Sequence, residues 1–140
     1  MADNIVSARG ISKRFVGTQA LEDVTLAFAA GRVHALIGEN GAGKSTLIKI
    51  LGGVYQPDTG SIEVDGVACR FSGPRDAHGA GIIIIPQEMR VVAAQTVAEN
   101  VLLGALPRKL TLGVVPATDL RTMARRTQVL LARLNLMVDP

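Results

Sequence analysis

Residues 38–46 carry the clearest chemical signal in the chain, with the sequence Gly-Glu-Asn-Gly-Ala-Gly-Lys-Ser-Thr. This stretch fits the pattern G-x-x-x-x-G-K-[ST], a loop that binds the phosphate groups of a nucleotide. Glycines adopt backbone angles that a Cβ atom would forbid, and they let phosphate oxygens approach several backbone N–H groups at once. The predicted nucleotide-binding residues of this loop are Gly38, Glu39, Asn40, Gly41, Ala42, Gly43, Lys44, Ser45 and Thr46.

Two side chains of the loop suit a nucleotide and its metal ion. The Lys44 ammonium is a compact cation that can reach the β- and γ-phosphates. The Ser45 hydroxyl can occupy one position on Mg²⁺, which otherwise keeps water and phosphate oxygens as ligands. A helix that begins near Gly43 would add unpaired N–H groups and a positive dipole end. The alternative interpretation is a glycine-rich turn with a surface lysine.

The flanking residues predict the elements that must hold this loop. Residues 33–37 are a short apolar run, which is typical of a buried strand. Residues 46–51 have the apolar spacing of a helix, and Gly52-Gly53 is a plausible left-handed stop. The sequence therefore predicts a strand, a glycine loop and a helix in succession.

Composition sets the class of protein. A chain of 140 residues with 48% hydrophobic and 19% charged residues can form one globular domain with a core. The net charge is only +3 and aromatic residues make up 3%, so we do not expect a nucleic-acid surface. The single cysteine, Cys69, excludes a disulfide framework within the chain. We see no secretory signal, and no run approaches the ~18 apolar residues of a membrane span.

Further elements follow from local patterns. Strands are predicted over 5–15 and 21–28, as a small antiparallel unit, and a hairpin around Asp65-Gly66. The run Ile82-Ile83-Ile84-Ile85 predicts a strand buried on both faces of a parallel sheet. Helical turns are predicted over 74–78, and a helix is predicted from the capping box Thr96–Glu99 to about Leu103. Residues 104–116 are predicted to form a loop. An amphipathic helix follows, and the residues on its buried face are Leu120, Met123, Ala124, Thr127, Leu130, Leu131 and Leu134.

Several stretches resemble the nucleotide-binding domains of ABC transporters. Gly60-Ser61-Ile62 and Pro86-Gln87-Glu88 follow the glycine loop in the order and spacing of that family. Residues 71–77 and 96–104 closely resemble the ATP-binding proteins of bacterial monosaccharide importers of the ribose, galactose and xylose type. The resemblance covers nearly the whole chain. It implies an α/β fold, with a P-loop NTPase core of the ABC ATPase type, a small antiparallel β element and the start of a helical subdomain.

The resemblance also implies roles for individual residues. ATP and Mg²⁺ would be the cofactors, held by the glycine loop as the Walker A motif. Gln87 would be the catalytic Q-loop glutamine, which reaches Mg²⁺ and the attacking water. Phe15 falls where the family places an aromatic ring under the adenine, and core packing is the alternative for this residue. Residues 1–87 would form the core and antiparallel part, and residues 88–140 the Q-loop and helical subdomain.

The partners and location are implied in the same way. The helical subdomain would dock on the transmembrane permease of a sugar importer, and a second nucleotide-binding domain would complete the ATP site. The chain would then lie at the cytoplasmic face of the inner membrane, as a peripheral protein. ABC-type ATPases outside transport are a further alternative, against which the sugar-importer-like stretches argue.

Three family motifs are absent from this sequence: the signature Leu-Ser-Gly-Gly-Gln, the Walker B strand with its Asp-Glu, and the switch histidine. Both histidines, His34 and His78, precede Gln87 and are ordinary residues in this interpretation. We therefore expect nucleotide binding at most, with negligible hydrolysis, by the isolated chain, and we expect it to self-associate through apolar surface. Its parent would be a sugar-transporting ATPase. The alternative is a natural truncated module that binds nucleotide or docks to a permease without turnover.

Overall fold

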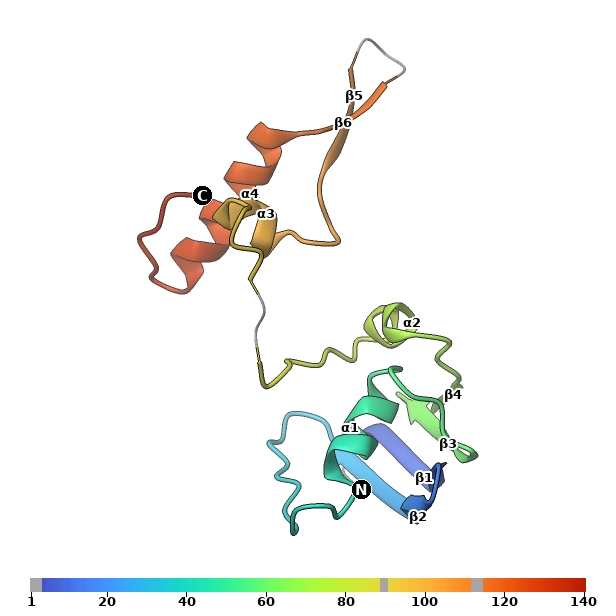
Figure 1. Cartoon of the computed structure of the whole chain (residues 1–140). Coiled ribbons are helices and arrows are strands. Elements are labelled where there is room, and N and C mark those ends of the chain that lie inside the picture. Colours follow the sequence, from blue (N-terminus) through green and yellow to red (C-terminus); the bar gives the residue numbers. More distant parts are fainter. Residues whose placement is uncertain (1–3, 89–90, 112–114) are drawn as a thin grey trace. The chain divides into compact units, whose positions relative to one another are not determined.

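The computed structural model describes residues 4–88, 91–111 and 115–140 (Figure 1). The chain forms two compact units, Met1–Pro86 and Gln87–Pro140. Each unit has its own helices and its own antiparallel sheet. We describe the two units separately.

The first unit is built on a four-stranded antiparallel sheet in the order β2-β1-β3-β4. Its strands are β1 (Asn4–Phe15), β2 (Thr18–Ala29), β3 (Thr59–Val64) and β4 (Val67–Cys69). Along β2, Val24, Leu26 and Phe28 are half-buried and alternate with exposed Thr25 and Ala27, as predicted. The two predicted N-terminal strands and their antiparallel pairing are confirmed.

The predicted hairpin at Asp65-Gly66 is also confirmed. Both residues have positive φ, 48° and 75°, which is the conformation of the tight type I′ turn. The turn sets the register in which Val64 pairs with Val67.

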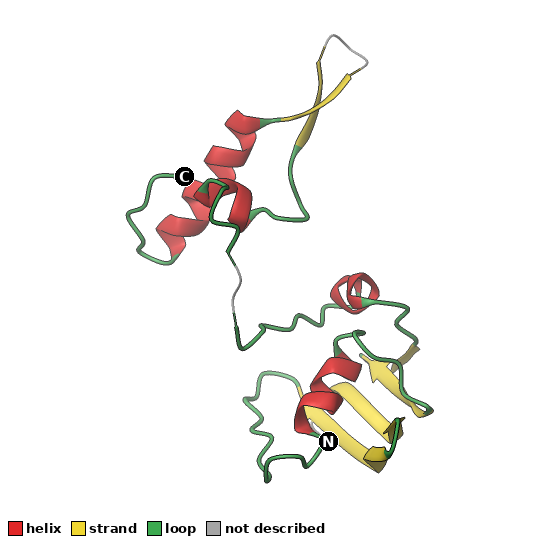
Figure 2. Cartoon of the chain, in the orientation of Figure 1, coloured by secondary structure: helices red, strands yellow, loops and turns green. Residues whose placement is uncertain are grey.

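One helix covers the sheet and closes the core of the first unit. Helix α1 (Lys44–Leu51) lies across the strands (Figure 2) and buries Leu47 and Ile50 against Ala8, Ile11 and Leu21. It ends at Gly52, and Gly53 has a φ of 71°, the left-handed stop that the glycine pair predicts. Helix α2 (Pro74–Gly79) adds Ala77 to the same core.

Two predicted strands do not form. Residues 33–37 and 82–85 are all described and have no strand conformation. Val33 and Ile37 are 101% and 90% exposed, and Ile83 and Ile85 are 70% and 82% exposed. A strand buried in a parallel sheet needs hydrogen-bonded neighbours on both sides, and no described residues pair with either segment. The prediction of a buried parallel sheet from these runs is therefore wrong for this structure.

The second unit packs two helices together. Helix α3 (Val97–Val101) begins with the predicted capping box: the Thr96 side chain accepts a hydrogen bond from the Glu99 N–H, and the Glu99 carboxylate accepts one from the Thr96 N–H. Helix α4 (Leu120–Arg133) buries Met123, Thr127 and Leu131. Its stripe is narrower than predicted, because Leu120, Leu130 and Leu134 are exposed. Helix α4 packs against α3, which has only five residues and is too short to cover a wide stripe of α4.

The predicted loop over residues 104–116 contains a strand. Residues Arg108–Thr111 (β5) pair with Val115–Thr118 (β6) in a two-stranded antiparallel ribbon. Strands of four residues carry too few positions for a clear alternation, and proline is tolerated on an edge strand, as Pro116 shows. None of the described helices is both long and apolar enough to span a membrane.

Candidate nucleotide-binding site

The glycine loop adopts a tight, exposed conformation in front of α1. The Ala42 N–H donates a hydrogen bond to the Glu39 carbonyl oxygen over 3.2 Å, which closes a turn through Asn40. Gly41 and Gly43 have φ values of 88° and 83°, angles that favour glycine. All residues from Gly38 to Ala42 are exposed. The loop therefore presents its backbone to solvent, as a phosphate site requires.

Gly43 is also required by a close approach. A Cβ atom at this position would lie 2.4 Å from the Ala20 carbonyl oxygen and 2.6 Å from Leu21 Cδ2. Both neighbours belong to β2, so the absence of a side chain lets the start of α1 pack directly on the sheet. The sheet thereby fixes the loop in place.

The Lys44 side chain folds back over the loop. Its Nζ donates hydrogen bonds to the carbonyl oxygens of Gly38 at 2.6 Å and Glu39 at 2.7 Å. An ammonium group has three donors, so one remains for an incoming phosphate oxygen. The two bonds hold the positive charge at the centre of the loop.

The first turn of α1 adds further donors. The first hydrogen bond within this helix runs from the Leu47 N–H to the Gly43 carbonyl oxygen at 2.9 Å. The N–H groups of Lys44, Ser45 and Thr46 therefore have no acceptor inside the helix. No acidic side chain lies in that turn, and the Ser45 residue is exposed. One ammonium, several amides and a hydroxyl form a donor set that fits a nucleotide polyphosphate with Mg²⁺.

Phe15 ends β1 and lies outside the buried core. Its residue is 37% exposed, and its ring packs edge-on against Tyr55 with the centroids 5.2 Å apart and an interplanar angle of 67°. The Lys13 ammonium lies 5.8 Å from the ring centroid. The ring is therefore open to a flat ligand, although its role in binding a base stays a prediction.

Comparison with known proteins decides the family. The family model described as "ABC transporter" matches residues 21–139. The chain belongs to the ABC transporter family. An ATP-binding cassette from an ABC transporter, solved without nucleotide, superimposes with a TM-score of 0.67 at 31% identity, over 74% of this chain and 41% of that one. The predicted ABC-type α/β fold class is thereby confirmed.

The relatives are sugar-import proteins. The chain is 49% identical over 97% of its length to an arabinose import ATP-binding protein of Burkholderia cenocepacia. It is 47% identical over 94% of its length to one of Yersinia pestis. It spans 25% and 24% of these two relatives. The predicted similarity to ABC ATPases of monosaccharide importers is thus confirmed.

Gln87 is the residue predicted to be the Q-loop glutamine of the family. This residue is exposed and is the first residue of the second unit. Its catalytic and metal-binding roles stay predictions.

His34, which the sequence suggested was an ordinary residue, accepts a hydrogen bond at Nε2 from the Ala29 N–H at 3.0 Å and so helps to end β2.

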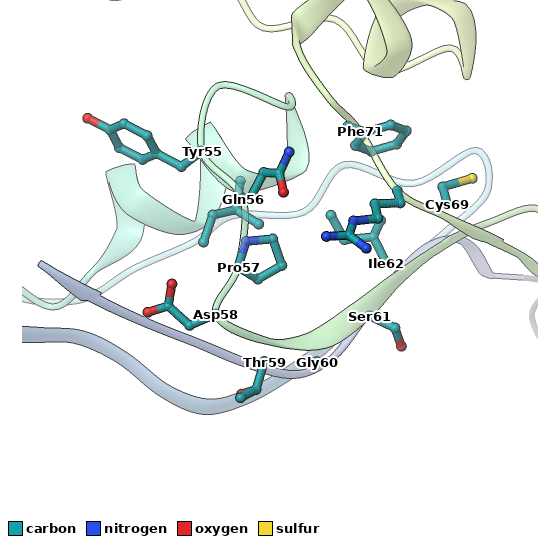
Figure 3. A pocket seen from close by; sticks show the side chains of 12 residues that line it. Tyr55, Gln56, Pro57, Asp58, Thr59, Gly60, Ser61, Ile62, Cys69 and Phe71 are labelled. Carbon is teal, nitrogen blue, oxygen red and sulfur yellow. The ribbon is translucent and has the colours of Figure 1, made fainter.

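A cavity of about 370 Å³ lies beside the loop that joins α1 to β3 (Figure 3). None of the glycine-loop residues lines it. Tyr55 and Asp58 are among the residues that line it, and no sequence motif predicted a role for either. The available signal was the scarcity of aromatic residues, since Tyr55 is the only tyrosine in the chain.

Proposed function

We propose that this chain supplies the ATP-binding loop of the ATPase subunit that energises monosaccharide import across a bacterial inner membrane. The observation that carries the proposal is the position of Lys44 Nζ, 2.6–2.7 Å from two carbonyl oxygens of the glycine loop, beside the free N–H groups of α1. The similarity of the chain to arabinose import ATP-binding proteins supports a monosaccharide as the transported substrate. We place the protein at the cytoplasmic face of that membrane, bound through a permease.

The chain's own residues would divide the work of binding. The third donor of Lys44 and the amides of Lys44–Thr46 would bind the phosphate oxygens, and the Ser45 hydroxyl would bind Mg²⁺. Phe15 would stack on the adenine, and the Gln87 side chain would reach the metal and orient water. Bound ATP supplies the phosphoanhydride bond whose hydrolysis drives transport.

Hydrolysis needs groups beyond this loop, because the γ-phosphate charge must be stabilised and a water molecule oriented. We propose that a second nucleotide-binding domain and a permease, the latter docking on residues 88–134, complete the working assembly. The isolated chain would bind ATP with negligible turnover. Turnover well above background that Lys44→Ala abolishes would contradict this.

The sugar-import role can be tested in the source bacterium. We would introduce Lys44→Ala into the gene and measure uptake of radiolabelled arabinose, ribose, galactose and xylose. Uptake of at least one sugar should fall to background, while Arg75→Ala, which changes an exposed arginine of α2 outside the glycine loop, should leave it unchanged. Normal uptake of all four sugars in the Lys44→Ala strain would contradict the proposed substrate class.

A further inference from the structure

The loop between α1 and β3 holds the end of β1, where Phe15 lies. Asp58 Oδ1 accepts a hydrogen bond from Lys13 Nζ and Asp58 Oδ2 accepts one from the Arg14 N–H, each at 2.7 Å. The Asp58 N–H donates to the Ser12 carbonyl oxygen at 2.9 Å. Together with the edge-on contact between Tyr55 and Phe15, these bonds surround the end of the strand. We call residues 55–58 the clamp loop.

The Tyr55 and Asp58 side chains of the clamp loop, which contact the end of β1, point the same way. Figure 3 shows Tyr55 and Asp58 projecting to one side of the loop, away from Phe71 and Cys69. Gln56 and Pro57, which lie between them in sequence, project to the opposite side. The side of the clamp loop that carries Tyr55 and Asp58 therefore contacts the end of β1, while residues on both sides of the loop line the cavity.

The clamp loop is also fixed to the helix that carries the phosphate site. The N–H groups of Val54 and Tyr55 both donate to the Lys49 carbonyl oxygen, at 2.8 and 3.2 Å. The Lys49 ammonium lies 5.5 Å from the centroid of the Tyr55 ring. Lys49 is in the last turn of α1, and Lys44 is in its first. The backbone of α1, the hydrogen bonds to Lys49 and the ring contact between Tyr55 and Phe15 thus connect the phosphate donors to Phe15.

We propose that Tyr55 and Asp58 are positioning residues for nucleotide binding, acting through Phe15. They fix the Phe15 ring relative to α1, so that the base and the phosphates of one nucleotide are received at a set spacing. A half-exposed ring at a strand end would otherwise lose rotamer freedom when it stacks on a base, and this cost weakens binding. The inference rests on the proposed function, in which Phe15 stacks on adenine.

The test compares two ligands that differ in the base. MgATP and magnesium tripolyphosphate are titrated calorimetrically into the whole chain and its variants. An edge-to-face ring contact is worth a factor of about 2 to 12 in affinity. Tyr55→Leu should weaken ATP binding by about that factor, and Asp58→Asn should weaken it as well. Both should leave tripolyphosphate binding unchanged, because tripolyphosphate has no base to stack. Tyr55→Phe keeps the ring and should bind both ligands as the unsubstituted chain does.

Two matched controls lie in the same sheet. Phe28→Leu removes another edge-on ring pair, with His34 at 5.4 Å, and Glu63→Gln removes another ion pair, with Arg9 at 3.0 Å. Neither should change the affinity for either ligand. A double-mutant cycle separates the positioning role from a direct one: in a Phe15→Leu background, Tyr55→Leu should cause no further loss of ATP affinity.

Three outcomes would overturn the inference. In the first, Tyr55→Leu and Asp58→Asn bind ATP as tightly as the controls do. In the second, these substitutions weaken the binding of ATP and of tripolyphosphate equally. In the third, the double-mutant cycle gives additive losses of ATP affinity. Failure of the unsubstituted chain to bind tripolyphosphate would instead contradict the proposed function, and the inference with it.

Discussion

Lys44 is held in place by its own loop. Two of its three donors bind carbonyl oxygens within the glycine loop. Since the flexible side chain is already ordered, binding a phosphate oxygen costs less side-chain entropy than it would for a free surface lysine. The residue pattern predicts a lysine near the phosphates, and the structure adds how that lysine is fixed.

Asp58 gives a prediction about acid stability at the scale of one residue. The hydrogen bond from Lys13 and then that from the Arg14 N–H hold the pKa of this carboxyl below its ordinary value. A carboxyl with a lowered pKa in the folded state stabilises the fold above its unfolded-state pKa, and this contribution disappears as pH falls through the folded-state pKa. Asp58→Asn should therefore lower the free energy of unfolding at neutral pH and change it progressively less as the pH falls below about 4.

Urea unfolding at a series of pH values measures this effect. Asp119 offers a parallel case in the second unit, because hydrogen bonds from the Thr122 side chain and backbone lower its pKa. The same pH dependence should appear for Asp119→Asn. A pH-independent difference between the Asp58→Asn variant and the unsubstituted chain would contradict the ion-pair argument.

The start of α1 gives a prediction at the scale of an element. Gly41 and Gly43 both have positive φ, but only Gly43 has atoms where a Cβ would lie, with the Ala20 carbonyl oxygen at 2.4 Å. Gly41→Ala should therefore cost only the backbone strain, about 1–2 kcal/mol. Gly43→Ala should cost that strain plus about 1–3 kcal/mol for displacing the helix from β2.

Chemical denaturation of the two variants side by side measures the difference between them. Because the strain is common to both, the difference isolates the contact between α1 and the sheet. Equal destabilisation by the two substitutions would mean that β2 does not hold the loop in place.

Elements with a local cause could be predicted from the sequence. A few neighbouring residues determine each of three such features: the Asp65-Gly66 turn, the Thr96–Glu99 capping box and the alternation along β2. The apolar runs 33–37 and 82–85 indicate that a segment is suited to burial, but they do not specify a neighbouring strand. The prediction of parallel strands failed for this reason.

The same distinction applies to the site. The glycine loop is contiguous, so its pattern alone predicts roles for Lys44 and Ser45. Asp58 and its partners Lys13 and Arg14 are 45 and 44 residues apart in sequence, and only folding brings them together. No local pattern could have selected Tyr55 or Asp58 from the loop that contains them.

At the scale of the whole molecule, exposed apolar side chains predict self-association. Val33, Ile37, Ile83 and Ile85 are each at least 70% exposed, and all four belong to the runs that lack strand partners in the described residues. Such runs can pair with another chain. Sedimentation velocity should reveal species heavier than 14.7 kDa that grow with concentration. Replacing the four residues with threonine should reduce the proportion of these heavier species. If the unsubstituted chain is a monomer at all concentrations, the prediction is contradicted.

The measurement that tests the central claim most directly is calorimetric titration of MgATP into the whole chain, into Lys44→Ala and into Lys109→Ala. The chain belongs to the ABC transporter family, and its loop geometry predicts one saturable site per chain. Binding should be retained by Lys109→Ala and lost in Lys44→Ala. If Lys44→Ala binds ATP as tightly as the unsubstituted chain, or if the latter does not bind it, the glycine loop is not the phosphate site that we describe.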